Sequence, residues 1–225
     1  MKAVFAMPMR SAAHAMAAAL FFALIPAGHA LRAQPAPQQR PGLERALTIR
    51  QFNALARRQR VRTPVGRSVG RQAEWLEMKT VYDLGAPAPE WIDELAFRYH
   101  LMLALPPENR GDPPRYSLFQ ITVLYADIQH GRNRNSTVFL RPPALLRFGE
   151  PVAAAVEILH EGKLIAESSE ESPDFARQIP KGEKWFRNPA VMDSKAVTRR
   201  DGYLLNRAQS PWVLTSPDDY EYIKP

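Results

Sequence analysis

The chain of 225 residues contains no cysteine. It therefore has no disulfide, no cysteine nucleophile, no thiolate metal ligand and no cysteine for a bacterial lipoprotein anchor. A cysteine-free domain in an oxidising compartment must be stabilised by a hydrophobic core rather than by cross-links. Proline, in contrast, is abundant, at about twice its average frequency. Its 21 copies exclude long helices and favour short elements joined by turns.

Histidine is scarce, and after residue 30 the chain has only His100, His130 and His160. The local patterns place His100 on the more polar face of a strand, His130 in a turn and His160 at a hairpin. His160 and Glu161 begin like the H-E-x-x-H zinc motif, but Leu164 occupies the position of the second histidine. We therefore predict no metal site and no cofactor, with convergence of the three histidines on zinc as the alternative.

A serine-hydrolase pattern occurs once, as GRSVG at residues 66–70. A nucleophile elbow requires a buried strand before the serine and a helix after it. The residues before Ser68 are basic and interrupted by proline, and a glycine stands where the helix would begin, so we interpret Ser68 as part of a linker. No catalytic residue is predicted. Paired carboxylates of a carbohydrate-active enzyme stay an alternative, for example among Asp93, Glu94, Asp127 and Glu157.

Basic and acidic charge are separated along the chain, whose net charge is +7. Residues 31–72 hold ten arginines and a single glutamate and so contribute +9. Because residues 1–30 add +2, residues 73–225 carry the remaining −4. Nucleic-acid binding requires basic charge on a folded face with aromatic side chains among it, and the basic segment contains only Phe52. We predict no nucleic-acid partner.

Residues 1–30 are typical of an export signal. Lys2 and Arg10 precede an apolar, alanine-rich run, and small residues allow cleavage after Ala30 or Ala33. Retention of this segment as an uncleaved anchor is the alternative. We expect an exported protein that is periplasmic, outer-membrane-associated or extracellular.

Residues 31–72 are expected to form a basic arm. A proline-rich linker at 34–42 precedes residues 43–60, whose apolar positions have a loosely helical spacing. This spacing predicts either a short amphipathic helix or a solvated arm. The arm is expected to contact an anionic membrane, the cell wall or a partner protein.

From residue 73 apolar and polar residues alternate with period two, as in half-buried strands. Short strands separated by proline and glycine turns predict an all-β antiparallel sandwich over residues 73–225, with an OB-like barrel as the structural alternative. A helical turn or two is expected at 172–179. The predicted strands are 74–84, 94–105, 116–128 and 137–142, a hairpin over 152–169 that turns at Glu161 and Gly162, and possible edge strands within 202–206 and 211–216.

Aromatic and proline landmarks resemble a known family in their order. They are APEWIDELAFRYHLML (88–103), YSLFQITVLYADI (116–128), STVFLRPPALLRFGE (136–150), KGEKWFRN (181–188) and SPWVLTSPDDYEYIKP (210–225). In these stretches the chain resembles the verrucomicrobial pilus-like proteins with an immunoglobulin-like fold that are associated with type IV pilus gene clusters. The resemblance covers residues 74–225.

The resemblance implies an immunoglobulin-like sandwich and a non-enzymatic role in the envelope or at the pilus, and it supplies no catalytic residues. A type IV prepilin has a long apolar helix directly after its processing site. Here prolines follow the signal segment. An accessory, structural or assembly component is therefore expected, rather than the major pilin.

The expected partners are other pilus or envelope proteins. Trp185 and Phe186 follow the polar stretch KGEK, which suits a surface loop, with burial in the core as an equal alternative. Two other functions stay open: a cell-wall or carbohydrate-binding module, and a chaperone-like sandwich with an exposed, unpaired edge strand. The residues predicted to contact a partner are Trp185, Phe186, Trp212, Arg57, Arg58 and Arg60.

Overall fold

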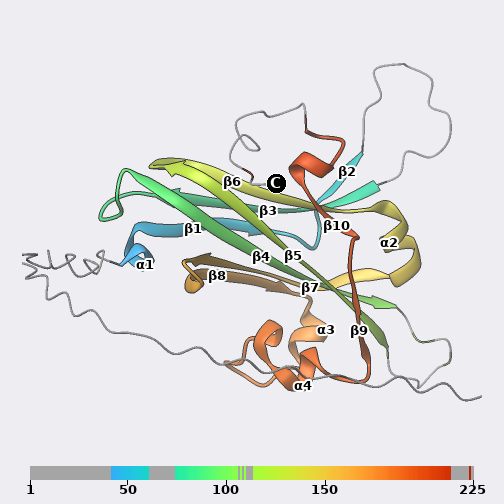
Figure 1. Ribbon diagram of the computed structural model, residues 1–225. Helices are drawn as coiled ribbons and strands as arrows, with labels where there is room; N and C mark the ends of the chain where they lie inside the picture. The colour runs from blue at the N-terminus through green and yellow to red at the C-terminus, as the bar shows by residue number, and fades with distance from the viewer. Residues whose placement is uncertain are drawn as a thin grey trace, which may run out of the picture. The chain divides into compact units, whose positions relative to one another are not determined.

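Figure 1 shows the computed structural model, which describes residues 42–60, 74–105, 107, 109, 114–213 and 223. The predicted export signal and Ser68 lie outside these residues. Two β-sheets pack face to face, which confirms the predicted all-β sandwich. Within the described part of the chain the strands do not close into one continuous ring, so the OB-like barrel alternative is wrong.

The first sheet is antiparallel and has the strand order β1-β3-β6-β10. β2 pairs with β3 beyond the end of β1, along the same edge. The strands are β1 (Leu47–Asn53), β2 (Arg58–Arg60), β3 (Glu74–Leu84), β6 (Gly131–Leu140) and β10 (Leu204–Asn206).

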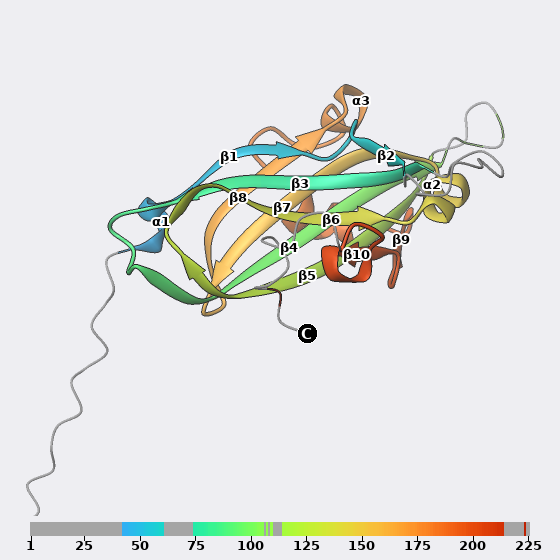
Figure 2. The ribbon, with the colours of Figure 1, turned by 90° about the horizontal axis from the view of Figure 1, so that it is seen from above.

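The second sheet has the order β8-β7-β4-β5-β9, and its strands cross beneath the first sheet obliquely (Figure 2). All its pairs are antiparallel except β5 with β9, which run parallel. This parallel pair is the one departure from the predicted antiparallel arrangement among the described strands. The strands are β4 (Trp91–Leu105), β5 (Arg115–Gln129), β7 (Glu150–His160), β8 (Lys163–Glu171) and β9 (Val197–Arg200).

The helices are short, and three of them begin at a proline. Proline has no backbone N–H, which suits the first helical turn because an N–H there would have no intrahelical acceptor. Ser172 precedes one of these, and its side chain accepts a hydrogen bond from the N–H of Phe175, as its position before a proline suggested. No helix in the described part of the chain is long and apolar enough to cross a membrane. The helices are α1 (Leu43–Ala46), α2 (Pro142–Phe148), α3 (Pro173–Ala176) and α4 (Pro189–Met192), with 3-10 turns η1 (Trp185–Arg187) and η2 (Arg207–Gln209).

The main core lies between the two sheets. The predicted alternation in β4 is confirmed, because Leu95, Phe97, Tyr99, Leu101 and Leu103 are all fully buried on the inner face. The hydroxyl of Tyr99 donates a hydrogen bond at 2.9 Å to the side chain of Thr80 or at 3.0 Å to a backbone carbonyl of β6, so its burial leaves no polar group unpaired.

Residues 43–60 belong to the sandwich, which corrects the prediction of a helical or solvated arm ending at residue 72. Only α1 is helical. β1 then pairs with β3 from Leu47 to Asn53, and Leu47, Ile49 and Phe52 pack against the main core. The apolar positions of this segment have a loosely helical spacing, but apolar and polar residues also alternate from Leu47 to Ile49, as in a strand. The spacing alone therefore did not distinguish a helix from a strand. The folded domain therefore begins well before residue 73.

Two further predictions need correction. β6 begins at Gly131 rather than near residue 137, because its polar first half pairs with β3 while its side chains face solvent. Residues 211–213 form a turn rather than an edge strand, and residues 214–216 lie outside the described residues.

The predicted hairpin between β7 and β8 is confirmed. Glu161 and Gly162 both have positive φ angles, 52° and 76°, which is the geometry of a two-residue turn between antiparallel strands. Glycine adopts this backbone conformation without steric cost.

A further layer covers the face of the second sheet that points away from the first. The segment that contains α3, η1 and α4 lies over this outer face (Figure 1). Side chains from the segment and from the sheet form a second buried cluster of Met102, Leu118, Ala153, Ala155, Phe175, Trp185, Phe186 and Met192. The second sheet is thus buried on both faces over part of its area.

Candidate functional site

A network of charged side chains lies at the edge of the second buried cluster, on the outer face of β4 and β7. Its centre is Glu157, which is 6% exposed. His100 Nε2 donates to one carboxylate oxygen at 2.9 Å, and Arg187 Nε donates to the other at 2.8 Å. The guanidinium of Arg98 lies 3.6 Å from the carboxylate, and Arg187 also pairs with Glu167. The buried carboxylate is therefore fully paired.

The protonation states of the two central groups follow from these contacts. Burial lowers the pKa of His100, and this outweighs the opposing effect of the Glu157 carboxylate. Burial would raise the pKa of Glu157, but the hydrogen bonds from His100 and Arg187 outweigh it, so this pKa lies below its usual value. His100 is neutral at pH 7, with its proton on Nε2, because Nδ1 accepts from Gln120 Nε2 at 2.8 Å.

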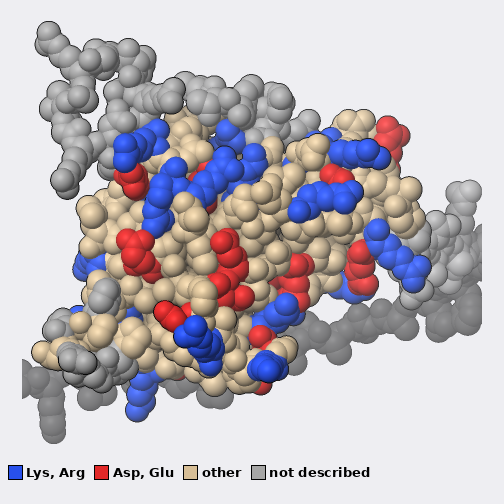
Figure 3. Space-filling view, turned by 180° about the vertical axis from the view of Figure 1, so that it is seen from behind, with Lys and Arg blue, Asp and Glu red and all other residues tan. Residues whose placement is uncertain are grey.

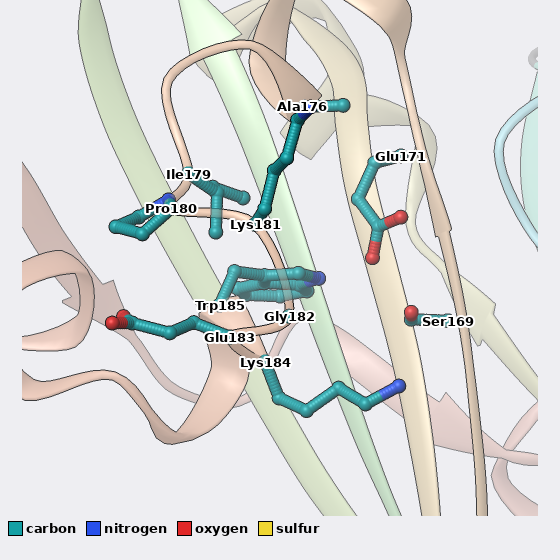
Figure 4. Close-up of a pocket in the computed structure, with 10 residues that line it drawn as sticks. All are labelled: Ser169, Glu171, Ala176, Ile179, Pro180, Lys181, Gly182, Glu183, Lys184 and Trp185. Carbon is teal, nitrogen blue, oxygen red and sulfur yellow. The ribbon is translucent and has the colours of Figure 1, made fainter.

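A pocket of about 300 Å³ opens beside this cluster, between β8 and the loop that joins α3 to η1. Figure 4 shows Lys184 extending across the opening toward Ser169, while the indole nitrogen of Trp185 faces the strand that carries Ser169 and Glu171. Ile179 and Pro180 supply the apolar part of the wall.

Several polar groups of the pocket have no partner within the described chain. The side chains of Ser169, Glu171, Lys181 and Lys184 make neither a hydrogen bond nor an ion pair with described residues. Trp185 is 1% exposed, and its Nε1 has no hydrogen-bond acceptor there either. A buried donor without an acceptor is rare in native structures. The pocket therefore offers unused hydrogen-bonding capacity, unlike the neighbouring network.

The pilus-like resemblance is tested by comparison with known proteins. The model of a pilus-like protein family matches residues 60–225, more than half of the chain. The chain belongs to this family. A crystal structure of a protein from Akkermansia muciniphila is similar to this pilus-like chain with a TM-score of 0.60. That similarity covers 80% of this chain and 93% of the other at 21% identity, and at this identity it shows the fold alone. A comparison with curated proteins found no match.

In this pilus-like protein Trp185 and Phe186 are core residues, so their prediction as surface contacts is wrong. Phe186 is 4% exposed, and its ring lies 5.5 Å from that of His100. Trp185 packs edge to face with Phe175. The polar stretch before Trp185 does lie at the surface, but the two aromatic side chains turn inward to cover the second sheet.

Trp212 is half-buried on the outer face of the first sheet. Its ring stacks on Phe139 with centroids 4.5 Å apart and meets Trp75 edge to face. Trp91, at the start of β4, is the more accessible tryptophan, with 48% of its surface exposed.

The arginines predicted to bind a partner are engaged within the protein. Arg57 pairs with Glu77, Arg58 with Glu150 and Arg60 with Glu74. Arg50 likewise pairs with Asp83. Figure 3 shows basic and acidic side chains next to one another over much of one face. These four arginines of the basic segment therefore neutralise acidic residues of their own domain, which removes Arg57, Arg58 and Arg60 as free contact residues.

The carboxylates of the enzyme alternative do not come together in the pocket. Asp93 and Asp127 are exposed near the end of the β4–β5 pair, and Glu94 is half-buried there. Glu157 is held in the charged network. The pocket of Figure 4 is lined by none of the four.

The three histidines lie in different elements or loops of the fold. His100 is buried rather than on a solvated face, because the outer layer covers it. His130 lies between β5 and β6, and His160 ends β7, where its Nδ1 contacts the carbonyl of Glu94 at 2.9 Å. No group of three or more potential metal ligands occurs among the residues that the structure describes.

Two features of this region escaped the sequence analysis: the pairing of His100 with Glu157 and the unpaired groups of the pocket. One signal was present, since Glu157 interrupts the otherwise apolar run VAAAVEIL, and a charge in a buried strand requires a partner. Lys181 and Lys184 carry no such signal, because charged residues near a glycine turn are ordinary loop residues, and Glu171 is one of several glutamates at the polar end of β8.

Proposed function

We propose that this protein is a non-enzymatic, exported component of the cell envelope with an immunoglobulin-like sandwich, and that it serves type IV pili as an accessory, structural or assembly protein. Membership of the pilus-like family over residues 60–225 carries the proposal. The two-sheet sandwich supports it, since this architecture presents loops and strand edges to partner proteins.

Two observations favour this role over the alternatives. None of the candidate catalytic carboxylates lines the described pocket, and Glu157 is held by arginine and histidine, which supports a binding role rather than glycoside hydrolysis. Three of the edge strands are short or charged: β10 has three residues, β9 ends in two arginines, and β8 ends in a stretch of three glutamates and two serines. Such edges resist strand pairing, which disfavours a chaperone-like function.

Affinity purification of a tagged full-length chain from detergent-solubilised envelope tests the proposal. Mass spectrometry of the eluate identifies the partners and the mature N-terminus together. We expect proteins of the pilus machinery and a chain that begins after Ala30 or Ala33. Enrichment of cell-wall fragments without any pilus protein would overturn the pilus role, and recovery from the cytoplasm with an intact N-terminus would overturn export.

A further inference from the structure

The pocket between β8 and the α3–η1 loop has the chemistry of a ligand site. We propose that it binds the free carboxylate end of a peptide chain, with Trp185 and Lys184 as the groups that hold the carboxylate. This ligand goes beyond the proposed function, because family membership assigns no ligand to the pocket. Binding of a peptide end is independent of a role at pili, so either one can be wrong without the other.

The indole N–H of Trp185 points to an acceptor supplied by a ligand. Trp185 lines the pocket, and its indole nitrogen is buried and has no acceptor in the described chain. An indole N–H can only donate, so only an acceptor brought by a ligand or by water satisfies it. Figure 4 shows this nitrogen facing the strand that forms the far wall. A carboxylate oxygen seated between Trp185 and β8 would accept from it.

The lysines of the loop differ from the arginines around it in their pairing. Arg177 pairs with Asp174, and Arg187 pairs with Glu157 and Glu167, so these cations stabilise the fold. Lys181 and Lys184 pair with no described residue. Lys184 reaches across the opening, where its ammonium can meet the same carboxylate that Trp185 binds.

The polar groups of the pocket indicate the kind of ligand. Glu171 would repel a ligand that carries negative charge throughout, such as a phosphate, but its carboxylate and the Ser169 hydroxyl can accept from a peptide N–H. A peptide end supplies both a carboxylate and N–H donors. A volume of about 300 Å³ suits a terminal residue rather than a long segment, and Ile179 and Pro180 offer an apolar wall for its side chain.

An acidic sugar is the competing source of a carboxylate, and the geometry disfavours it. A sugar ring gains most from stacking on an exposed aromatic face. The Trp185 ring is buried against Phe175 and Phe186, so only its nitrogen edge is directed toward the pocket. The pocket therefore presents hydrogen-bond donors rather than a stacking platform.

The indole N–H signal of Trp185 in a two-dimensional ¹H–¹⁵N spectrum reports directly on the site. The chain has four tryptophans, so the signals are few, and Trp185→Phe assigns the relevant one. The probes are N-acetylated tripeptide mixtures that carry every standard amino acid at the last position, one mixture with a free carboxylate and one with a carboxamide. Glucuronate serves as the acidic-sugar probe. We expect the free-acid mixture to move the Trp185 signal in a saturable way and the carboxamide mixture to leave it in place.

Lys184→Gln should weaken binding of the free-acid mixture about ten-fold, because one charge-assisted hydrogen bond is lost. Lys79→Gln, a matched change on the first sheet, should leave the affinity unchanged. No movement of the Trp185 signal, equal movement with both mixtures, or unchanged affinity in Lys184→Gln would overturn the proposal. Saturable movement with glucuronate but not with the peptides would assign the pocket to acidic sugars instead and overturn the peptide ligand.

Discussion

The carboxylate of Glu170 accepts a hydrogen bond from the backbone N–H of Ala54 at 2.9 Å. The same oxygen also accepts from the N–H of Leu55 at 3.2 Å. Glu170 lies on β8, an edge strand of the second sheet, whereas Ala54 follows β1 of the first sheet. One side chain thus joins the two sheets along an open side of the sandwich, and it satisfies two backbone donors that have left the β1 ladder.

Replacing Glu170 with alanine should lower the free energy of unfolding by about 1–3 kcal/mol, because the two part-buried N–H groups lose their charged acceptor. Glu171→Ala is the matched control, since the neighbouring carboxylate has no partner in the described chain. Urea denaturation measures both. Equal stability of the two variants would show that Glu170 does not join the sheets.

Trp185→Ala and Phe186→Ala should each destabilise the protein by about 3–5 kcal/mol, as expected for large aromatic side chains removed from a buried cluster. Trp91→Ala should change stability by less than about 1 kcal/mol, because nearly half of that side chain is already in water. Thermal or urea unfolding distinguishes the cases. If Trp185→Ala were as mild as Trp91→Ala, the outer layer would not pack on the second sheet.

The free energy of unfolding should fall in two stages as the pH is lowered. His100 and Glu157 both have a lower pKa in the folded chain, so the unfolded chain binds more protons as the pH drops and folding weakens. The contribution of His100 is complete above its usual pKa of 6.5 and is lost below it, and that of Glu157 is complete above 4.5 and is lost at still lower pH. His100→Gln should abolish the first stage in urea titrations at a series of pH values and keep the second. If the pH dependence of the free energy of unfolding were the same in His100→Gln as in the wild type, the first stage could not be due to His100.

The arginine pairs should differ in their contribution to stability. Glu77 is 4% exposed and accepts from Arg57, so Arg57→Ala leaves a buried carboxylate with fewer donors and should cost about 1–3 kcal/mol. The side chains of Arg60 and Glu74 are 63% and 41% exposed, and Arg60→Ala should cost less than about 1 kcal/mol. Urea denaturation of the two variants checks the order, and a larger loss in Arg60→Ala would contradict it.

The sandwich could be predicted from alternation because most strands bury one face only. β3 begins and ends at the predicted residues, and β4 and β5 extend the predicted strands by only a few residues. The β6 boundary failed because the strand begins with polar residues, although the backbone of Gly131, Arg134 and Asn135 pairs with β3. Side-chain patterns do not report backbone pairing.

The arm and the site were harder to predict for a different reason. The carboxylates that pair with Arg57, Arg58 and Arg60 are distant in sequence, so only the fold reveals that the basic segment and the acidic remainder attract one another within one domain. The burial of Trp185 likewise depends on the chain folding back over the second sheet after β8. Local composition reports neither ion pairs between distant residues nor burial by a segment that folds back.

The number of pili on cells that lack this protein tests the central claim most directly. The measurement compares sheared surface pili from a deletion strain with those from strains complemented by the wild-type chain, by Arg60→Ala or by Trp185→Ala. A pilus component should give fewer pili on deletion, full recovery with the wild-type chain and Arg60→Ala, and poor recovery with the destabilised Trp185→Ala. Pili of unchanged number and length in the deletion strain would contradict the role at the pilus.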